Sequence, residues 1–458
     1  MTDVRKSGRQ ERFDRAGGVF RALRHRNYRL FYAGQGISLI GTWMQRIALS
    51  WLVYERTGSV ALLGIVGFSG QIMTFAAAPF AGVLADRVNR RRLLVATQTV
   101  AMVQAFVLAG LTYTDAISVW HIIGLSIMLG LVNGFDIPIR QSFVVEMVEG
   151  REDLPNAIAL NSSMVNGAKL VGPSLAGVLI ALVGEAMCFF VNGLSFVAVI
   201  VALLAMRVQP RERHAQEAHV LRHMKDGFAY AFGFMPIRSI LLLLALVSLL
   251  GMSYTTLLPA VAKDILHGDA RTLGFLMGSG GVGALFGAIF LAARKDTRGL
   301  VRVIAIASVL FGAALVGFAV VLFGVVLLGV PFSISFVISV VLLAVAGAGS
   351  MIQMASSNTV LQTIVDEDKR GRVMSFYTMA FMGMGPFGSL LAGFLAHWIG
   401  IPLTIAITGG GSIAAALVFA SWLPAMNRKV HRIYAQRKLV PVPAVAGNGE
   451  SVPLVGKQ

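Results

Sequence analysis

The sequence predicts an all-α integral membrane protein with twelve transmembrane helices in two pseudo-symmetric six-helix halves. Of its 458 residues, 56% are hydrophobic and only 13% are charged, whereas a soluble domain carries about 25% charged residues. The apolar residues gather in runs of about 20, the length that spans a bilayer as a helix. Matching Gly-Pro pairs in two of these runs indicate a duplicated unit.

Twelve apolar runs predict the spans, at residues 30–54, 60–84, 93–113, 117–139, 157–183, 185–206, 239–261, 272–293, 300–328, 332–357, 373–396 and 400–424. The even number puts both termini on one side of the membrane. Of the 39 Lys and Arg residues, 34 fall in the termini and connectors on that side, and the positive-inside rule makes it the cytoplasmic side. We therefore expect a multi-pass protein of the bacterial cytoplasmic (inner) membrane with both termini in the cytoplasm.

The spans divide the chain into five parts. Residues 1–29 form a basic cytoplasmic segment, 30–206 the first half, 207–238 a cytoplasmic connector, 239–424 the second half, and 425–458 a largely disordered cytoplasmic tail. Residues 19–31 and 220–235 alternate apolar and basic side chains at helical spacing, which is typical of amphipathic helices on an anionic lipid leaflet. A solvated basic loop is the competing interpretation for the first of these.

Composition also excludes several functions. The net charge of +17 could suggest nucleic acid, but the basic residues stand in short connectors between apolar runs, so we expect no nucleic-acid partner. The single cysteine, Cys188, cannot form an intrachain disulfide. The sequence shows no metal-ligand cluster, nucleophile constellation or phosphate loop, so we expect no enzyme activity, cofactor or metal. We expect a monomer.

A repeat points to the interface between the halves. The fifth span of each half carries a Gly-Pro pair, Gly172-Pro173 and Gly385-Pro386. A proline inside a helix removes a hydrogen bond and bends it, and glycine lets helices approach closely. Coincidence among 50 glycines is the alternative. Paired repeats in a membrane protein predict a transporter whose site lies between the repeats near the midplane.

Several motifs carry a family resemblance. The connector 82–94 reads GVLADRVNRRRLL and resembles the signature loop of the major facilitator superfamily, with Asn89 where that pattern usually has glycine. Segments 34–45, 135–142, 156–163 and 356–375 resemble the branch that includes the enterobactin exporter and other drug- and siderophore-efflux proteins. The resemblance implies the major facilitator fold and alternating access, and it does not imply one substrate.

The same connector supplies candidate gating residues. They are Gly82, Asp86, Arg87 and Arg90, together with Arg370 and Arg372 in the later connector DEDKRGR. The orientation rule explains arginines but not an acid, and a carboxylate at a membrane edge can meet the positive end of a helix. The resemblance implies that this helix is span 11, in the other half. A solvated turn is the alternative for the second connector.

Ionisable groups inside spans are costly and mark functional sites. Lys169 lies about 18 Å into span 5 and Arg46 about 24 Å into span 1 at 1.5 Å per residue, so we expect both to contact substrate. Asp136 and Arg140 stand four residues apart, which suits either proton coupling or a structural ion pair. Uncharged candidates for the substrate site are Gln35, Asn133, Asn166, Tyr254, Gln353 and Asn358; interhelical hydrogen bonding is the alternative for each.

These observations predict a secondary active transporter that exports a small organic compound, coupled to protons. Two interior cations with no acid near any midplane favour an anionic or neutral amphiphile over a lipophilic cation. A siderophore or similar anionic metabolite is the substrate that we expect first. Multidrug efflux of cationic or neutral drugs is the first alternative. A membrane sensor or lipid-handling protein without transport is the alternative from another class.

Overall fold

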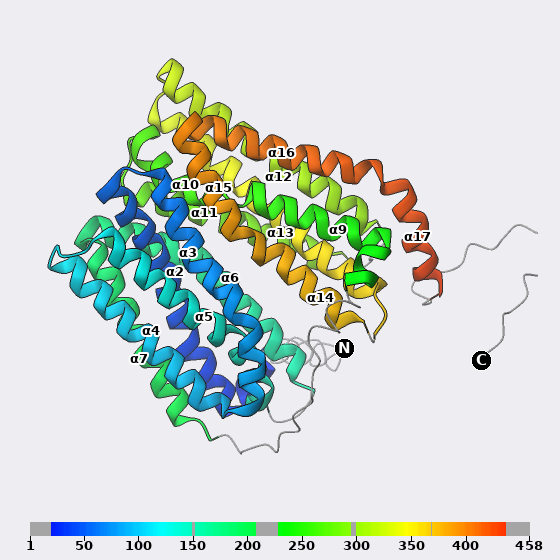
Figure 1. Cartoon of the computed structure of the whole chain (residues 1–458), viewed down its shortest axis with the longest axis horizontal. Coiled ribbons are helices and arrows are strands. Elements are labelled where there is room, and N and C mark those ends of the chain that lie inside the picture. The colour runs from blue at the N-terminus through cyan, green and yellow to red at the C-terminus, as the bar shows by residue number, and fades with distance from the viewer. Residues whose placement is uncertain (1–19, 149–151, 208–227, 295–298, 368, 437–458) are drawn as a thin grey trace, which may run out of the picture.

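The computed structural model describes residues 20–148, 152–207, 228–294, 299–367 and 369–436, and these ranges are helical without a strand. The N-terminal half contains α2 (Arg26–Thr57), α3 (Val60–Arg87), α4 (Arg90–Tyr113), α5 (Val119–Met147), α6 (Leu154–Val183) and α7 (Glu185–Ala205). The C-terminal half contains α9 (Met235–Leu246), η2 (Val247–Gly251), α10 (Tyr254–Ala260), η3 (Val261–Ile265), α11 (Ala270–Ala292), α12 (Leu300–Leu328), α13 (Phe332–Ile364), α14 (Arg370–Thr378), η4 (Met379–Gly383), α15 (Met384–Ile399) and α16 (Ile401–Ser421). Figure 1 shows the two bundles side by side.

Eleven of the helical segments in the described ranges are long and apolar enough to cross a membrane. Two of them are composite, because α9 runs through η2 and α10 into η3, and α14 runs through η4 into α15. The 32-residue α2 is not among the eleven. It packs along α6 and α7, and it carries the charges of Arg46, Glu55 and Arg56, which lower its hydropathy.

Local sequence fixes where the helices begin and end. The Ser59 hydroxyl accepts the Leu62 backbone N–H at the start of α3, and the Asn89 side chain accepts the Arg92 backbone N–H at the start of α4. Such caps satisfy backbone donors that the first turn leaves free. Gly58 ends α2 at a φ of 59°, a left-handed conformation that glycine adopts without strain.

The two halves touch at one end of the molecule, which we call the closed end. It holds Tyr54, Gly64 and Gly177, and the helices α3 and α6 of the first half pack there on α15 and α11 of the second. A Cβ on Gly64 would lie 2.7 Å from the Ser389 carbonyl oxygen, and one on Gly177 would lie 2.6 Å from the Ala270 carbonyl oxygen. Backbones therefore meet directly, which only glycine permits.

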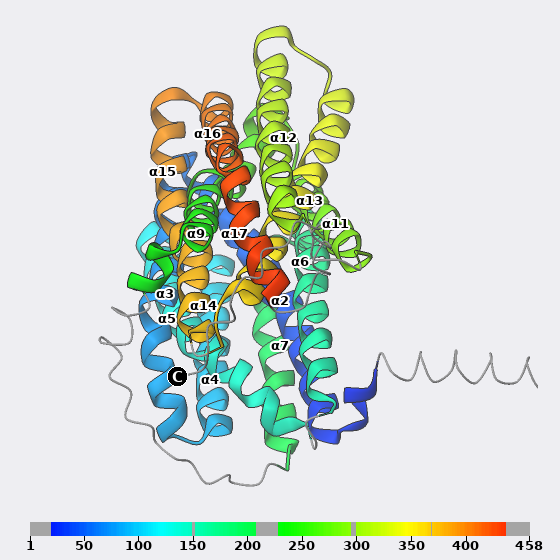
Figure 2. The ribbon, with the colours of Figure 1, turned by 90° about the vertical axis from the view of Figure 1, so that its right-hand side faces the viewer.

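The opposite end, where α2, α4 and α6 begin, is rich in arginine, and we call it the basic end. In Figure 1 the helices of the two halves diverge toward this end, and Figure 2 shows α14 and α17 lying apart from the ends of α4 and α7. The halves therefore form a structure that is joined at the closed end and separated at the basic end.

Two features of the fold were not predicted. Helix α17 (Leu423–Gln436) continues the chain where the sequence analysis placed a disordered tail. It packs Met426 and Val430 against the C-terminal half. The π-helical turns η2, η3 and η4 interrupt two spans. Residues 208–227, which hold the first half of the helix expected at 220–235, and residues 437–458 lie outside the described residues.

Candidate functional site

One face of α6 leads from the contact between the halves to an uncovered surface. Gly177 and Ser174 on this face pack against Gly274 and Gly278 of α11. About two and three turns further toward the basic end from Ser174, Asn166 and Ser163 of the same face are exposed. Residues three or four apart share a helix face, so the face that α11 covers at the closed end is open at the middle of the molecule.

Two basic side chains lie close to one indole ring, where the covered part of this face gives way to the open part. The Arg46 guanidinium carbon lies 4.4 Å from the centroid of the Trp43 ring, and the Lys169 Nζ lies 5.6 Å from it. Trp43 and Arg46 come from α2 and Lys169 from α6. The helices are held together at Gly172, where a Cβ would lie 2.5 Å from the Trp43 Cβ. Gly172 therefore brings the indole within reach of the lysine.

The depth of this site follows from the helix rise. Arg46 precedes Tyr54 by eight residues, and Lys169 precedes Gly177 by eight. Eight residues rise about 12 Å, so both cations stand about 12 Å inward from the closed end. Both side chains are exposed, and they therefore line the point where the two halves begin to separate.

The site holds two positive charges without a facing acid. Among the described residues neither Arg46 nor Lys169 forms an ion pair. The cation–π geometry places the two charges within about 10 Å of each other. Like charges at that distance repel by about 2 kcal/mol at an effective dielectric constant of ~20. An anion between them would remove this cost.

Two neutral polar groups lie at a similar depth in the N-terminal half. Asn166 lies one turn from Lys169 and donates its Nδ2 to the Ser162 carbonyl oxygen at 2.9 Å. Gln71 of α3, exposed, faces α15 of the other half; a Cβ on Gly385 would lie 3.1 Å from its Oε1. The sequence analysis missed Trp43 as a site residue. Trp43 had a usable signal, because it stands three residues before a membrane-embedded arginine.

The other predicted substrate residues do not join this cluster. Gln35 is buried about 16 Å along α2 from Arg46 at 1.5 Å per residue, and Asn133 is half-buried on α5. Tyr254 is buried against Phe311, with ring centroids 6.4 Å apart.

On α13, neither of the two predicted residues has a hydrogen bond to Arg46 or Lys169 among the described contacts. Gln353 is buried, and its Nε2 has no hydrogen-bond partner in the part of the chain that the structure describes. Asn358 accepts a hydrogen bond from Gln362 at 2.5 Å.

Asp136 is buried inside the N-terminal half rather than at the interface. Its carboxylate accepts hydrogen bonds from Thr97 at 3.0 Å and from Gln98 at 2.7 Å, both on α4. The predicted partner Arg140 lies 3.7 Å away. These contacts tie α5 to α4, and both interpretations of the pair, proton coupling and structure, remain predictions.

The predicted gating residues lie at the basic end. Gly82, Asp86 and Arg87 occupy the last turns of α3, outside the part of the chain whose side chains the structure describes. Arg90 pairs with Glu146 at 2.7 Å, which joins α4 to α5 within one half.

In the second connector, Arg370 lies 3.8 Å from Glu367, and Arg372 is half-buried on α14. Both residues belong to the C-terminal half. Their gating role stays a prediction.

A polar contact joins the halves at the closed end. The Tyr54 hydroxyl of α2 donates to the Asp264 carboxylate of η3. The sequence analysis did not single out Asp264, because nothing in the sequence shows which helix of the other half it meets.

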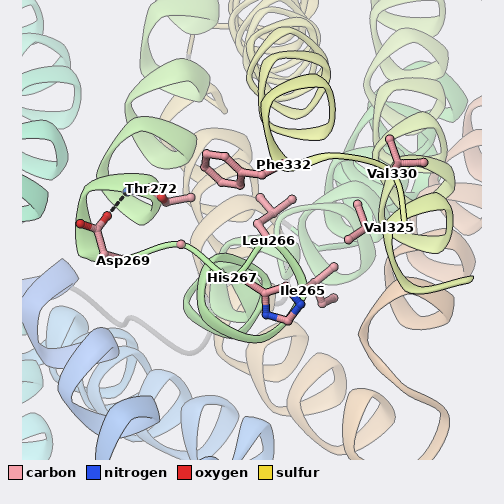
Figure 3. Close-up of a pocket in the computed structure, with 9 residues that line it drawn as sticks. Ile265, Leu266, His267, Asp269, Thr272, Val325, Val330 and Phe332 are labelled. Atoms are coloured by element: carbon pink, nitrogen blue, oxygen red, sulfur yellow. Dashed lines mark hydrogen bonds between the residues drawn. The ribbon is translucent and has the colours of Figure 1, made fainter. Parts of the chain in front are cut away.

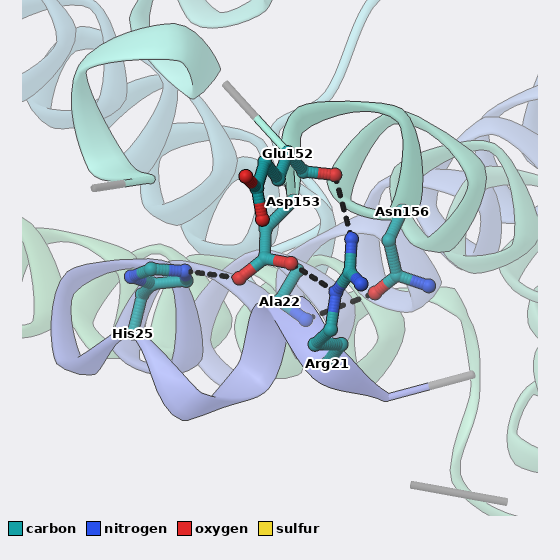
Figure 4. A network of polar contacts seen from close by, with 6 residues as sticks. All are labelled: Arg21, Ala22, His25, Glu152, Asp153 and Asn156. Atoms are coloured by element: carbon teal, nitrogen blue, oxygen red, sulfur yellow. Dashed lines mark hydrogen bonds and ion pairs between the residues drawn. The ribbon is translucent and has the colours of Figure 1, made fainter. Parts of the chain in front are cut away.

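At the basic end, the segment before α2 is attached to the start of α6 (Figure 4). Asp153 accepts from His25 at 2.8 Å and also pairs with Arg21, and the Ala22 backbone N–H donates to Asn156 at 2.9 Å. The hydrogen bond with His25 and the charge of Arg21 hold the pKa of Asp153 below its ordinary value. The segment thus packs on the N-terminal half.

A pocket of about 550 Å³ lies at the closed end of the C-terminal half (Figure 3). It is lined mainly by apolar side chains of the η3–α11 and α12–α13 connections, including Ile265, Leu266 and Phe332. The Asp269 carboxylate in this pocket accepts hydrogen bonds from two backbone N–H groups at the start of α11, at 3.0 and 3.2 Å. The pocket lies apart from the two cations, which remain the candidate site.

Comparisons with known proteins agree with this architecture. A family model described as transmembrane secretion effector matches residues 17–445. The Staphyloferrin A transporter of Staphylococcus aureus is 27% identical over 85% of this chain and 94% of its own length. Macrolide efflux protein A of Streptococcus pyogenes is 22% identical over 86% of this chain and 96% of its own length. The multidrug efflux pump Tap of Mycolicibacterium fortuitum is 24% identical over 81% of this chain and 88% of its own length.

Solved structures show the fold. A bacterial homologue of the iron transporter ferroportin, in an inward-facing state, superposes with a TM-score of 0.66 at 17% identity over 87% of this chain and 98% of its own. The predictions of an all-helical transporter fold and of a non-enzyme are confirmed by the family and its relatives. The chain is a multi-pass membrane transporter and belongs to the transmembrane secretion effector family of the major facilitator superfamily.

Proposed function

We propose that this transporter exports a siderophore or a similar anionic metabolite from the cytoplasm. The observation that carries the proposal is the pair of cations without a facing acid, Arg46 and Lys169, at the point where the halves separate. A relative named for transport of staphyloferrin A supports this substrate class.

The proposal implies one orientation of the molecule in the membrane and one state of the transport cycle. The basic end faces the cytoplasm, because Lys and Arg are retained on that side. The molecule joined at the closed end is then open to the cytoplasm, so substrate enters at the basic end and reaches the cations. Separation of the closed end would release it outside, and a proton moving inward would drive the cycle.

Multidrug efflux is the second candidate function. Relatives named for macrolide and multidrug efflux support it, and so do the exposed Met379 and Met382 of η4, since flexible thioether side chains accept varied apolar groups. Unpaired cations at the site disfavour cationic drugs.

Mass spectrometry of cells and medium from a deletion strain tests the proposal, with and without iron limitation. We expect one anionic metabolite, induced by iron limitation, to accumulate in the cells and to be lost from the medium. An unchanged set of secreted metabolites together with increased drug susceptibility would replace siderophore export with multidrug efflux.

A further inference from the structure

The charges in the membrane interior are divided unequally between the two halves. The N-terminal half carries Arg46 and Lys169 at the interface and the internal pair Asp136–Arg140. In the C-terminal half, residues 239–262, 272–292, 303–364 and 373–421 contain no Asp, Glu, Lys or Arg. Every charge available to a substrate at the membrane midplane therefore comes from one wall.

The facing wall is uncharged at the same depth. Eight residues inward from Gly393, which packs on Gly64, the chain reaches Gly385 opposite Gln71. Two residues further, Gly383 packs on Phe75 of α3, and beside this contact Met382 and Met379 of η4 are exposed. The C-terminal wall at this depth thus offers glycine backbone and thioether side chains.

We infer that the transporter binds its substrate in one orientation, with the anionic group on Arg46 and Lys169 of the N-terminal half and an uncharged body against η4 of the C-terminal half. This inference rests on the proposed function for the direction of transport only. It deepens the substrate class from any anion to an anion that is charged at one end.

Trp43 is the positioning residue of this arrangement. Its ring contacts both cations from one helix position, and a cation over an indole face is held by about 0.5–2 kcal/mol. The indole therefore holds the two cationic groups close to each other while no anion is bound. A substrate with a second charge at its far end would place that charge against the uncharged wall, which opposes binding.

Three related aromatic probes test the inference on the purified full-length protein in detergent, by equilibrium binding of tritiated compounds. They are 2-naphthoate, its neutral amide 2-naphthamide, and naphthalene-2,6-dicarboxylate, which carries a charge at each end. We expect 2-naphthoate to bind at least tenfold more tightly than either of the other two. Equal or tighter binding of the dicarboxylate would overturn the inference.

Substitutions in each wall give the matched comparison. Lys169→Gln and Arg46→Gln should each weaken the binding of 2-naphthoate at least tenfold and change the binding of 2-naphthamide less than twofold. Met382→Gln should weaken the binding of both probes equally. Arg56→Gln, which removes an exposed cation paired with Asp115 at the closed end, is the control and should change neither. If Lys169→Gln abolished the binding of both probes, Lys169 would not be the residue that recognises the charge of the substrate.

A gain of function provides a test that misfolding cannot imitate. Met382→Lys places a cation on the uncharged wall, and we expect it to tighten naphthalene-2,6-dicarboxylate at least tenfold relative to the unsubstituted protein. No gain in a variant that still binds 2-naphthoate would overturn the orientation. These binding data do not depend on which metabolite cells secrete, so they separate failure of this inference from failure of the proposed function.

Trp43→Leu separates positioning from direct contact. We expect a weaker 2-naphthoate affinity that Trp43→Phe partly restores, because a phenyl ring still attracts cations. Equal losses in the two variants would assign Trp43 a packing role only.

Discussion

At the residue scale, Lys169 decides whether the site selects charge. It stands on α6 beside the indole of Trp43 and has no acidic partner among the described side chains. A hydrogen bond to a charged group contributes about 1.5–3 kcal/mol, and 1.4 kcal/mol is a factor of ten. We expect Lys169→Met to reduce transport of anionic compounds about 10- to 100-fold and of neutral ones less than twofold.

Transport assays in proteoliposomes, with equal protein incorporation, measure this difference. Arg56→Gln again serves as the control for loss of a cation elsewhere in the same half. Equal losses for anionic and neutral compounds would show that Lys169 supports packing rather than recognition.

Asp153 gives a pH-dependent prediction at the same scale. Its pKa is lowered by the hydrogen bond with His25 and by the charge of Arg21. A carboxylate with a lowered pKa contributes its full stability above its ordinary pKa of 3.8, and the contribution is lost as the pH falls through the lowered value. We expect Asp153→Asn to lower the melting temperature of the purified protein at pH 7.

The difference between Asp153→Asn and the unsubstituted protein should shrink as the pH falls below about 4. Differential scanning fluorimetry over this pH range measures it. A difference that stays constant down to pH 3 would mean that the charge of Asp153 does not attach the N-terminal segment to α6.

At the scale of elements, we expect the crossing of α3 and α15 to be the point at which the closed end closes. Gly64 leaves no room for a side chain, because its Cβ would lie 2.7 Å from the Ser389 carbonyl oxygen. We expect Gly64→Val to prevent closure there and to stop transport. A cysteine at Ser50, between Tyr54 and Arg46 on α2, should then react several-fold faster with an impermeant maleimide added to intact cells.

Gly124→Val on α5 is the matched control, because no atom lies within 4 Å of a Cβ at Gly124. It should leave both transport and labelling unchanged. The native Cys188 is buried and contributes little background. Equal labelling in Gly64→Val and the unsubstituted protein would contradict the assignment of this crossing as the point of closure.

The elements also show how far sequence reasoning reaches. Hydropathy located the long apolar helices, since burial in lipid requires about 20 apolar residues. It ended α13 at 357, whereas the helix continues to Ile364, because polar residues such as Ser356 and Asn358 can extend a helix beyond the bilayer. It did not find η4 or α17, because a π-helical turn changes hydrogen bonding without changing hydropathy.

The site was predicted only in part, for a related physical reason. Cations are rare inside membrane spans, and so the sequence singled out Arg46 and Lys169 as candidates. Neutral residues such as Tyr254 and Gln353 serve equally well inside a half or at the interface, and only the rotation of each helix decides which. The contact of Tyr54 with Asp264 joins residues 210 positions apart, and no local pattern reveals it.

At the scale of the whole molecule, alternating access requires the two ends to open and close in turn. The closed end is joined by helix backbones and by Tyr54–Asp264, so an opposite state must join the basic end instead. The family resemblance assigns Asp86 to that contact. We expect Asp86→Asn to reduce transport strongly while membrane insertion stays normal, measured by flux in vesicles against protein content. Normal flux would remove Asp86 from the cycle.

The most direct test of the central claim uses inverted membrane vesicles, whose outer surface is the cytoplasmic face. Vesicles energised by respiration are incubated with an extract of iron-limited cells, and their contents are analysed by mass spectrometry. We predict that an anionic metabolite accumulates in vesicles with the unsubstituted protein, that nigericin abolishes the accumulation by collapsing the pH gradient, and that Lys169→Met vesicles lack it. Accumulation of a cationic or neutral compound to equal levels in both preparations would contradict the account.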